Sequence, residues 1–398
     1  MPEVAAQRQL RGGIDLGGTK IEAIVVDPDQ KILGNARRPT PTEGGPQDVA
    51  DQMAEALTAA AKEAGVETSE LAGIGVGSPG DVDEKAGTVA RARNLPGWED
   101  EFDLAGALSD KLGSKVYVGN DVQVATQAEF DLGAGRQYSS LLGVFWGTGV
   151  GGGLILDGKP WLGRGGAGEI GHMVVKMDGA HCPCGRRGCM EAYAGRAAME
   201  ARARREADKG TKTDLFRIMK QRGRTRLTSS VWAHALDHED SLATELIDRA
   251  IKALGAGVAS AVNLLDVEAV IIGGGLGVRF GEPMVKRIAH AMHPHLFNDE
   301  RPPAIMVAGL GDQGARWAPP CSSQTPRSWP ARPLRTRSRS ARRARLRART
   351  RRACARTRPR ARSPSRSTAR APSPGRPSPD RRGGRDPSSA GGPRRRGR

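Results

Sequence analysis

Short apolar runs alternate with amphipathic stretches along the first three quarters of the chain. Residues 12–27, GGIDLGGTKIEAIVVD, predict a strand, a glycine turn and a second strand, and residues 31–38 predict a third strand. The apolar spacing of residues 47–65 predicts a helix that ends at Gly65, a residue suited to a left-handed C-cap. Two further buried strands and a helix are predicted over residues 71–80, 114–121 and 122–133.

The opening pattern returns in the second half of the chain. Residues 140–158, SLLGVFWGTGVGGGLILDG, again predict a strand, a tight glycine turn and a strand. A long helix is predicted over residues 241–266, and a buried strand with a glycine turn over residues 267–277. The repetition predicts an α/β protein with two lobes built on one plan, each around a glycine-rich hairpin.

Composition changes sharply after about Ala318. Residues 319–398 hold 26 arginines, two aspartates and no lysine, and are otherwise rich in Ser, Pro, Ala and Gly. Such a segment has too little apolar surface to offset chain entropy, so we expect it to be disordered. Because the formal net charge of the chain is only +18, the residues before the tail are acidic on balance. We therefore expect no nucleic-acid partner, except through nonspecific phosphate contacts of the tail.

The cysteine usage points to a metal rather than to disulfides. The sequence has no signal-peptide core and no run of 18 apolar residues, so we expect a cytoplasmic protein with no membrane partner. In a reducing compartment, clustered cysteines more often bind metal than form disulfides. The chain has five cysteines, and three of them lie within the eight positions from Cys182 to Cys189.

One imidazole and three thiolates suffice for a closed, tetrahedral and therefore structural zinc site. Gly185 and Gly188 would let the short loop turn around the ion. The spacing alone leaves two alternatives open, a disulfide between Cys184 and Cys189 and the use of His181 as the histidine ligand. The candidate ligands are Cys182, Cys184 and Cys189, together with His172 or His181.

Three glycine-rich turns follow apolar strands, and their backbone N–H groups could form concave anion sites. An acidic residue at the end of the first strand, Asp15, could hold the hydration shell of Mg²⁺ while the turns hold phosphates. The chain lacks the P-loop pattern and the protein-kinase motifs, which excludes those two classes of phosphotransferase. The turns are Asp15-Leu16-Gly17-Gly18-Thr19-Lys20, Gly147-Thr148-Gly149 and Gly273-Gly274-Gly275.

Asn120 and Asp121 lie between a predicted strand and a predicted helix. By themselves, such residues most often form a helix cap. A carboxylate at the carboxyl end of a strand is also well placed to act as a general base. Both readings are open on the residues alone.

Seven motifs in this order resemble the ROK family of bacterial sugar kinases and repressors, and within it the glucokinases. The resemblance covers about Arg11 to Gly314. The motifs are GIDLGGTK, NLPGW, GNDVQVATQAE, GTGVGGG, GEIGH, CPCGRRGCME and VIIGGGLG.

The resemblance implies the actin-like ATPase fold, with a first lobe over residues 1–119, a second lobe over residues 120–318 and the tail beyond. It implies ATP-dependent phosphorylation of the 6-hydroxyl of glucose with Asp121 as general base, and it favours His172 over His181 as the zinc ligand. The implied cofactors are ATP, Mg²⁺ and structural Zn²⁺, and the expected assembly is a homodimer or homotetramer. The implied sugar-binding residues are Asn94, Asn120, Glu169, His172 and Glu191, and the implied nucleotide-binding residues are Asp15, Gly17, Gly18, Thr19, Lys20, Gly147, Thr148, Gly149, Gly274 and Gly275.

Other functions remain open within the same family. The sugar could be fructose, mannose or an N-acetylhexosamine, and polyphosphate could replace ATP as donor. Repressors of the family carry a helix-turn-helix ahead of the kinase-like part, whereas about ten residues precede Gly12 here, so we expect a kinase.

The end of the chain departs from the family. Family members normally end with a helix that begins Gly-Ala-x-Gly-Ala-Ala, but this sequence continues GLGDQGARWAPPCSS into the arginine-rich tail. Reading residues 314–323 one base out of phase permits Gly-Ala-Val-Gly-Ala-Ala-Leu-Leu. A GC-rich message in the wrong frame also yields Arg, Pro, Ala, Ser and Gly without Lys. We therefore expect a frameshift near Gln313.

Overall fold

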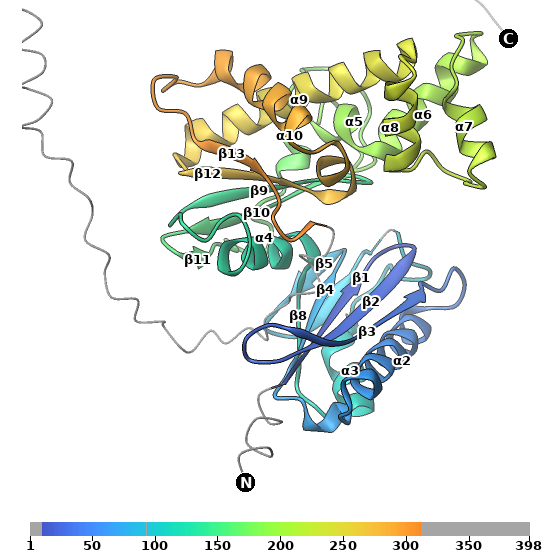
Figure 1. Cartoon of the computed structure of the whole chain (residues 1–398), viewed down its shortest axis with the longest axis vertical. Coiled ribbons are helices and arrows are strands. Elements are labelled where there is room, and N and C mark those ends of the chain that lie inside the picture. Colours follow the sequence, from blue (N-terminus) through green and yellow to red (C-terminus); the bar gives the residue numbers. More distant parts are fainter. Residues whose placement is uncertain (1–9, 93, 312–398) are drawn as a thin grey trace, which may run out of the picture. The chain divides into compact units, whose positions relative to one another are not determined.

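The computed structural model describes residues 10–92 and 94–311 (Figure 1). The predictions of a frameshift near Gln313 and of a disordered, phosphate-contacting tail over residues 319–398 lie outside the described residues. Within residues 10–92 and 94–311, no helix combines the length and the apolar character that crossing a membrane requires.

The first sheet has five strands in the order β3-β2-β1-β4-β8. β1 (Arg11–Leu16), β2 (Lys20–Val26) and β3 (Ile32–Pro39) form an antiparallel meander. β4 (Ile74–Ser78) pairs in parallel with β1, and β8 (Val116–Asn120) pairs in parallel with β4. Every residue of β4 is buried, which is typical of an interior parallel strand. The predicted strand–turn–strand and the two later strands are confirmed.

The second sheet repeats this plan in the order β11-β10-β9-β12-β13. β9 (Leu141–Trp146), β10 (Val150–Leu156) and β11 (Lys159–Pro160) form the antiparallel part. β12 (Ala269–Gly273) pairs in parallel with β9, and β13 (Ala304–Val307) pairs in parallel with β12. Each strand thus has a counterpart in the first sheet, in the same chain order and direction. The repeated sequence pattern correctly predicted this two-lobed α/β architecture.

Each sheet also has a helix between its third and fourth strands and another between its fourth and fifth. These are α2 (Pro46–Ala64) and α3 (Leu104–Leu112) in the first half, and α9 (Ser241–Leu265) and α10 (Gly274–Met292) in the second. Helix α2 ends at Gly65 in the left-handed conformation, with φ of 75°, as predicted. The glycines after β12 form the first turn of α10 rather than an isolated turn.

Several strands and helices were not predicted from the sequence. A small three-stranded sheet has the order β5-β6-β7, and its neighbour Trp98 is buried and donates its Nε1–H to the carbonyl of Val89 at 3.0 Å. Besides β11, β13, α3 and α10, the unpredicted strands and helices are β5 (Asp81–Asp83), β6 (Thr88–Ala90), β7 (Phe102–Asp103), α5 (Glu191–Ala194), α6 (Arg196–Asp208), α7 (Leu215–Gln221), α8 (Ser229–Asp237) and the short 3₁₀ helices Thr68–Glu70, Ile170–His172 and His293–His295.

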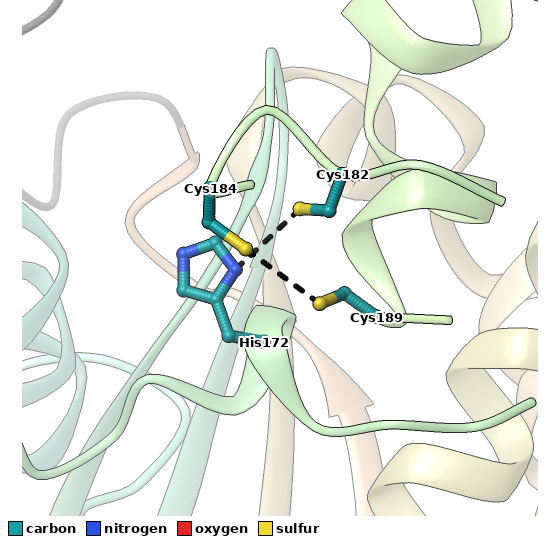
Figure 2. A group of neighbouring side chains, drawn as sticks. All are labelled: His172, Cys182, Cys184 and Cys189. Atoms are coloured by element: carbon teal, nitrogen blue, oxygen red, sulfur yellow. Dashed lines mark hydrogen bonds between the residues drawn. The ribbon is translucent and has the colours of Figure 1, made fainter. Parts of the chain in front are cut away.

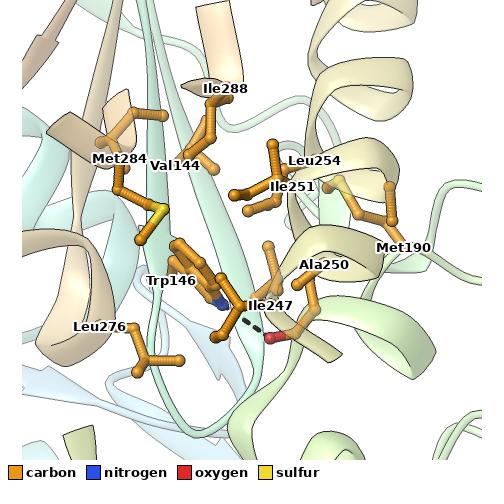
Figure 3. Close-up of a cluster of buried hydrophobic side chains, with 14 of the residues drawn as sticks. Val144, Trp146, Met190, Ile247, Ala250, Ile251, Leu254, Leu276, Met284 and Ile288 are labelled. Carbon is orange, nitrogen blue, oxygen red and sulfur yellow. Dashed lines mark hydrogen bonds between the residues drawn. The ribbon is translucent and has the colours of Figure 1, made fainter. Parts of the chain in front are cut away.

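A large apolar core lies between the second sheet and its helices (Figure 3). Trp146, at the end of β9, is fully buried and donates its Nε1–H to the carbonyl oxygen of Ala194 at 2.7 Å. The apolar faces of α9 and α10 supply Ile247, Leu254 and Ile288 to the same core. Burial of these side chains supplies most of the driving force that fixes the strand ends carrying the glycine turns.

Helix α4 (Asp121–Asp131) contacts strands of both sheets, β4 and β8 in the first and β9 and β10 in the second. Its Glu129 is 1% exposed, and the Glu129 carboxylate accepts hydrogen bonds from three backbone N–H groups. Glu129 Oε2 accepts from Ala134 at 2.9 Å and Gly309 at 2.9 Å, and Oε1 accepts from Leu310 at 2.8 Å. One buried carboxylate therefore joins α4 to the segment that follows β13.

Replacing Glu129 by Ala should lower the free energy of unfolding by about 2–4 kcal/mol, because buried N–H donors lose their acceptor. Urea unfolding followed by circular dichroism measures the loss. The control is Glu99→Gln at an exposed carboxylate, which should change stability by less than about 0.5 kcal/mol. Equal stability of the two variants would contradict this role of Glu129.

Candidate active site

Asp121 begins helix α4 directly after strand β8. The side-chain oxygen of Asn120 accepts hydrogen bonds from the backbone N–H groups of Val122 at 3.1 Å and Gln123 at 3.2 Å, so Asn120 is the helix cap. With its oxygen committed to the helix, the amide of Asn120 can offer a ligand its NH₂ group. The helix-cap and general-base interpretations of this pair are compatible, because Asn120 forms the cap and thereby holds Asp121 at the end of the strand.

The Asp121 carboxyl group is electrostatically adapted to proton transfer. Burial raises the pKa of Asp121 to about 6, with an opposing hydrogen bond from the backbone N–H of Val122 and a further raising effect of the Glu169 carboxylate. A general base works best when its pKa lies near the operating pH. The effect of Glu169 also means that two residues from distant parts of the sequence are near each other.

The first glycine turn joins β1 to β2. The carbonyl of Lys20 accepts from the N–H of Gly17 at 2.9 Å, which closes the turn. A Cβ atom on Gly18 would lie 2.9 Å from Nδ2 of Asn94, so Asn94 packs directly against the turn. Lys20 Nζ lies 2.7 Å from Glu22 Oε2 and forms an ion pair there. The ammonium group expected to meet phosphate is thus engaged with a carboxylate in this structure.

The second and third glycine turns are neighbours. Gly147 lies at the end of β9, and a Cβ atom on it would be 3.9 Å from the backbone nitrogen of Gly275 in the first turn of α10. Gly274 has φ of 75°, and a Cβ atom there would lie 2.7 Å from the carbonyl oxygen of Trp146. Only glycine fits this approach of α10 to β9. The predicted phosphate-binding residues of the second half therefore come together around one point.

Glu191 connects the second turn to the cysteine cluster. Its Oε2 accepts a hydrogen bond from the backbone N–H of Val150 at 2.9 Å. The same oxygen lies so close to Gly149 that a Cβ atom on residue 149 would collide with it. Its Oε1 lies 3.7 Å from Sγ of Cys182. A residue implied to bind sugar thus adjoins both a predicted phosphate turn and a predicted metal ligand.

Four side chains converge as the sequence predicted (Figure 2). Their donor atoms all lie within 4.8 Å of one another. His172 Nδ1 lies 3.7 Å from Cys182 Sγ, and Cys184 Sγ lies 3.7 Å from Cys189 Sγ. In a tetrahedral zinc site with Zn–S of about 2.3 Å and Zn–N of about 2.0–2.1 Å, ligand atoms lie about 3.5–3.8 Å apart. The donor set, His172, Cys182, Cys184 and Cys189, therefore fits zinc in chemistry and in spacing.

The two alternatives for this cluster do not fit. The 3.7 Å between Cys184 Sγ and Cys189 Sγ is far longer than the roughly 2.05 Å of a disulfide. His181 forms a backbone bridge with Arg187 and is not among the grouped donors, which include His172 instead. Gly185 and Gly188 have φ of 88° and 80°, so the loop turns where glycine was expected to let it turn.

Without a cation, the thiols would resist joint ionisation. Burial raises the pKa of Cys182 and of Cys189, and the neighbouring thiols contribute to both shifts. Although burial acts in the opposite direction, hydrogen bonds from the backbone of Arg186 and from Cys182 lower the pKa of Cys184 to about 7. A divalent ion is the group that would stabilise three thiolates together.

The second ring nitrogen of His172 points away from the cluster. Nε2 lies 3.8 Å from Oε2 of Glu169, while Nδ1 is on the thiol side. When a metal ion or hydrogen bond occupies one ring nitrogen of a histidine, the tautomer is set, and this determines whether the other nitrogen carries a proton to donate. Contacts therefore run from the cysteines through His172 to Glu169, and the Glu169 carboxylate in turn raises the pKa of Asp121.

Comparison with known proteins gives the family. The ROK family model matches residues 11–317. The chain is 35% identical over 311 residues to a glucokinase from Thermotoga maritima, covering 76% of this chain and 95% of the relative. It is 32% identical over 316 residues to an N-acetylgalactosamine kinase from Shewanella sp., covering 77% of this chain and 94% of that relative.

A solved structure shares the fold at similar identity. The ROK family glucokinase from Streptomyces griseus in complex with glucose and AMPPNP aligns with a TM-score of 0.67 and 31% identity, over 78% of this chain and 97% of that one. This chain belongs to the ROK family and has its actin-like ATPase fold. The family resemblance of the sequence motifs is confirmed.

The purified protein should contain about one zinc ion per chain, and replacing His172 by Ala should remove most of it, since a closed site needs all four donors. The matched control is His181→Ala, which leaves the four donors intact. Elemental analysis with thiol titration measures both. Zinc retained in His172→Ala and lost in His181→Ala would reverse the ligand assignment.

The carboxyl group of Asp121 should titrate near pH 6, protonated below and ionised above that value. Carbon-detected NMR of the side chain follows the midpoint. Glu169→Gln removes a negative charge and should move the midpoint to lower pH, whereas Asp131→Asn at the other end of α4 should leave it unchanged. A midpoint that does not respond to Glu169→Gln would contradict the coupling of the two carboxylates.

Proposed function

We propose that this chain is an ATP-dependent glucokinase, which transfers the γ-phosphoryl group of ATP to the 6-hydroxyl of glucose. Its membership of the ROK family and its similarity to the Thermotoga maritima glucokinase and to the Streptomyces griseus glucokinase bound to glucose and AMPPNP support ATP-dependent sugar phosphorylation. The observation that carries the proposal is the placement of Asp121 at the end of strand β8, where the cap residue Asn120 holds the start of helix α4; burial there raises the pKa of Asp121 to about 6.

In this proposal Asp121 is the general base. It accepts the proton of the 6-hydroxyl while that oxygen attacks the phosphoryl group in line. A pKa of about 6 keeps most of the carboxylate ionised at neutral pH while preserving its basicity. Neutral pH is therefore inside the range in which the proposed base is active.

The remaining sugar hydroxyls would be held by a mixed set of donors and acceptors, as a polyol requires. Glu169 and Glu191 would accept hydrogen bonds. The amides of Asn94 and Asn120 and the second nitrogen of His172 would donate them. Two contacts support a short distance between sugar and phosphate, because Asn94 packs on Gly18 of one turn and Glu191 packs on Gly149 of another.

The nucleotide phosphates would bind at the glycine turns, where backbone N–H groups offer donors without side-chain interference. The proposed residues of the second half are Gly147, Thr148, Gly149, Gly274 and Gly275, which come together in the fold. In the first turn, Gly17, Gly18 and Thr19 would face the phosphates, and Asp15 would hold Mg²⁺ through water. Lys20 contributes less on this account, because its ammonium group is paired with Glu22.

Zinc, when bound, would supply a fixed position and tautomer for His172 and no Lewis-acid chemistry, because a four-ligand site is closed. The residues of the chain itself would orient the sugar. The ring of His172 presents Nε2 beside Glu169, 3.8 Å away, so the donor and the acceptor that would share one sugar are aligned together.

An N-acetylhexosamine is the second candidate substrate. The N-acetylgalactosamine kinase from Shewanella sp. covers nearly all of its own length in the alignment at 32% identity. The proposed base and phosphate turns would serve either sugar, so the two candidates differ only in the acceptor. A coupled assay with glucose, mannose, fructose and N-acetylhexosamines, each with ATP and with polyphosphate, separates them.

Replacing Asp121 by Asn should lower kcat for the preferred sugar by roughly 10²–10⁴-fold, the usual contribution of a positioned base, with KM changed much less. Steady-state kinetics in the coupled assay measures both constants. Asp131→Asn is the matched control on the same helix and should keep normal turnover. Near-normal kcat in Asp121→Asn would exclude Asp121 as the base.

A further inference from the structure

The first residues of helix α6 hold the second glycine turn in place. The backbone N–H of Arg196 donates to the carbonyl of Gly147 at 3.1 Å, and that of Ala197 donates to the carbonyl of Thr148 at 3.0 Å. The guanidinium group of Arg196 adds a third bond, from Nη2 to Oγ1 of Thr148 at 2.8 Å. A positively charged side chain is thus attached directly to the hydroxyl group of the turn.

The charge of Arg196 is poorly balanced by its protein neighbours. Burial lowers the pKa of Arg196, and the positive charge of Arg226 lowers it further, against an opposing effect of Glu200. The carboxylate of Glu200 already accepts hydrogen bonds from other groups. Its Oε1 accepts from Arg204 Nη2 at 2.6 Å, and its Oε2 accepts the backbone N–H of Leu227 at 3.0 Å. A partly desolvated guanidinium group that also experiences a second positive charge favours an anion beside it.

The surroundings of Thr148 fit a chain of phosphates better than a single carboxylate. Besides Arg196, the first turn of α10 adjoins this turn through Gly147 and Gly275, and Ser229 Oγ would lie 4.0 Å from a Cβ atom on Gly275. The donors therefore extend from α6 across the glycine turn to α10 and α8. An extended polyanion can use several of them at once.

We propose that Arg196 is a positioning residue for the polyphosphate chain of the nucleotide, which it aligns through Thr148 and stabilises with its charge. This inference rests on the proposed function, in which nucleotide binds at the glycine turns. It adds a residue that lies outside the glycine motifs and acts on the phosphates rather than on the nucleoside. It also predicts discrimination by phosphate number, because only the phosphates carry the charge that Arg196 recognises.

The test is binding of adenosine, AMP, ADP and ATP to the full chain, measured by calorimetry, together with kcat and both KM values. Arg196→Gln keeps a side chain that can donate to Thr148 but removes the charge. It should weaken ATP and ADP binding by about 10- to 100-fold, leave adenosine binding and the KM for sugar unchanged, and make the KM for ATP less dependent on salt. Arg196→Lys should restore part of the lost ATP affinity.

Arg205→Gln, at an exposed arginine of the same helix, is the matched control and should bind every nucleotide normally. Equal ATP affinity in wild type and Arg196→Gln would overturn the role of Arg196 and leave the proposed function intact. An equal loss for adenosine and ATP would reduce Arg196 to a structural support and also overturn it. If the wild-type chain bound no ATP and phosphorylated no sugar, the proposed function itself would fail.

Discussion

The convergence of one imidazole and three thiols in a short loop is the constraint on which the candidate site depends. On one side, His172 links the cluster to Glu169, whose carboxylate contributes to the raised pKa of Asp121. On the other side, Cys182 lies beside Glu191, which accepts the N–H of Val150 at the edge of the second glycine turn. The cluster therefore adjoins both the proposed sugar-binding residues and the proposed phosphate-binding turn.

The internal repeat explains where these groups can meet. Both sheets are built from an antiparallel meander followed by two parallel strands, so each supplies a glycine turn after its first strand. Helix α4 contacts strands of both sheets and begins at Asp121, and Glu129 of the same helix holds the segment after β13. The proposed base thus lies on an element that packs against both sheets.

Much of this architecture could be predicted from the sequence because its signals are local. The strand–turn–strand patterns, the C-cap at Gly65 and the three clustered cysteines each occupy a few neighbouring positions. The motifs identified the ROK family, and the family resemblance favoured His172 over His181 as the fourth donor. The ion pair of Lys20 with Glu22 could not be predicted from the motif alone. It forms because residues two apart on β2 face the same side of the sheet, which brings the lysine to a carboxylate.

The contacts that escaped prediction depend on the path of the whole chain. Arg196 reaches Thr148 only because α6 begins against the second turn, and nothing in their spacing along the sequence indicates this. The small sheet and helices α6 to α8 were missed for the same reason, since their short or mixed segments become ordered by packing. For α6, the buried apolar residues Met199 and Ala203 are too few to set a clear helical period.

If a zinc ion bound by the cluster orients His172 for the sugar, glucose binding must depend on the metal. Calorimetry on the zinc-loaded protein, on the same sample stripped with a chelator, and after zinc is restored gives three dissociation constants. We predict that glucose affinity falls on stripping and returns with zinc, while the fold remains intact by circular dichroism. Undiminished glucose binding by the folded, metal-free protein would contradict it.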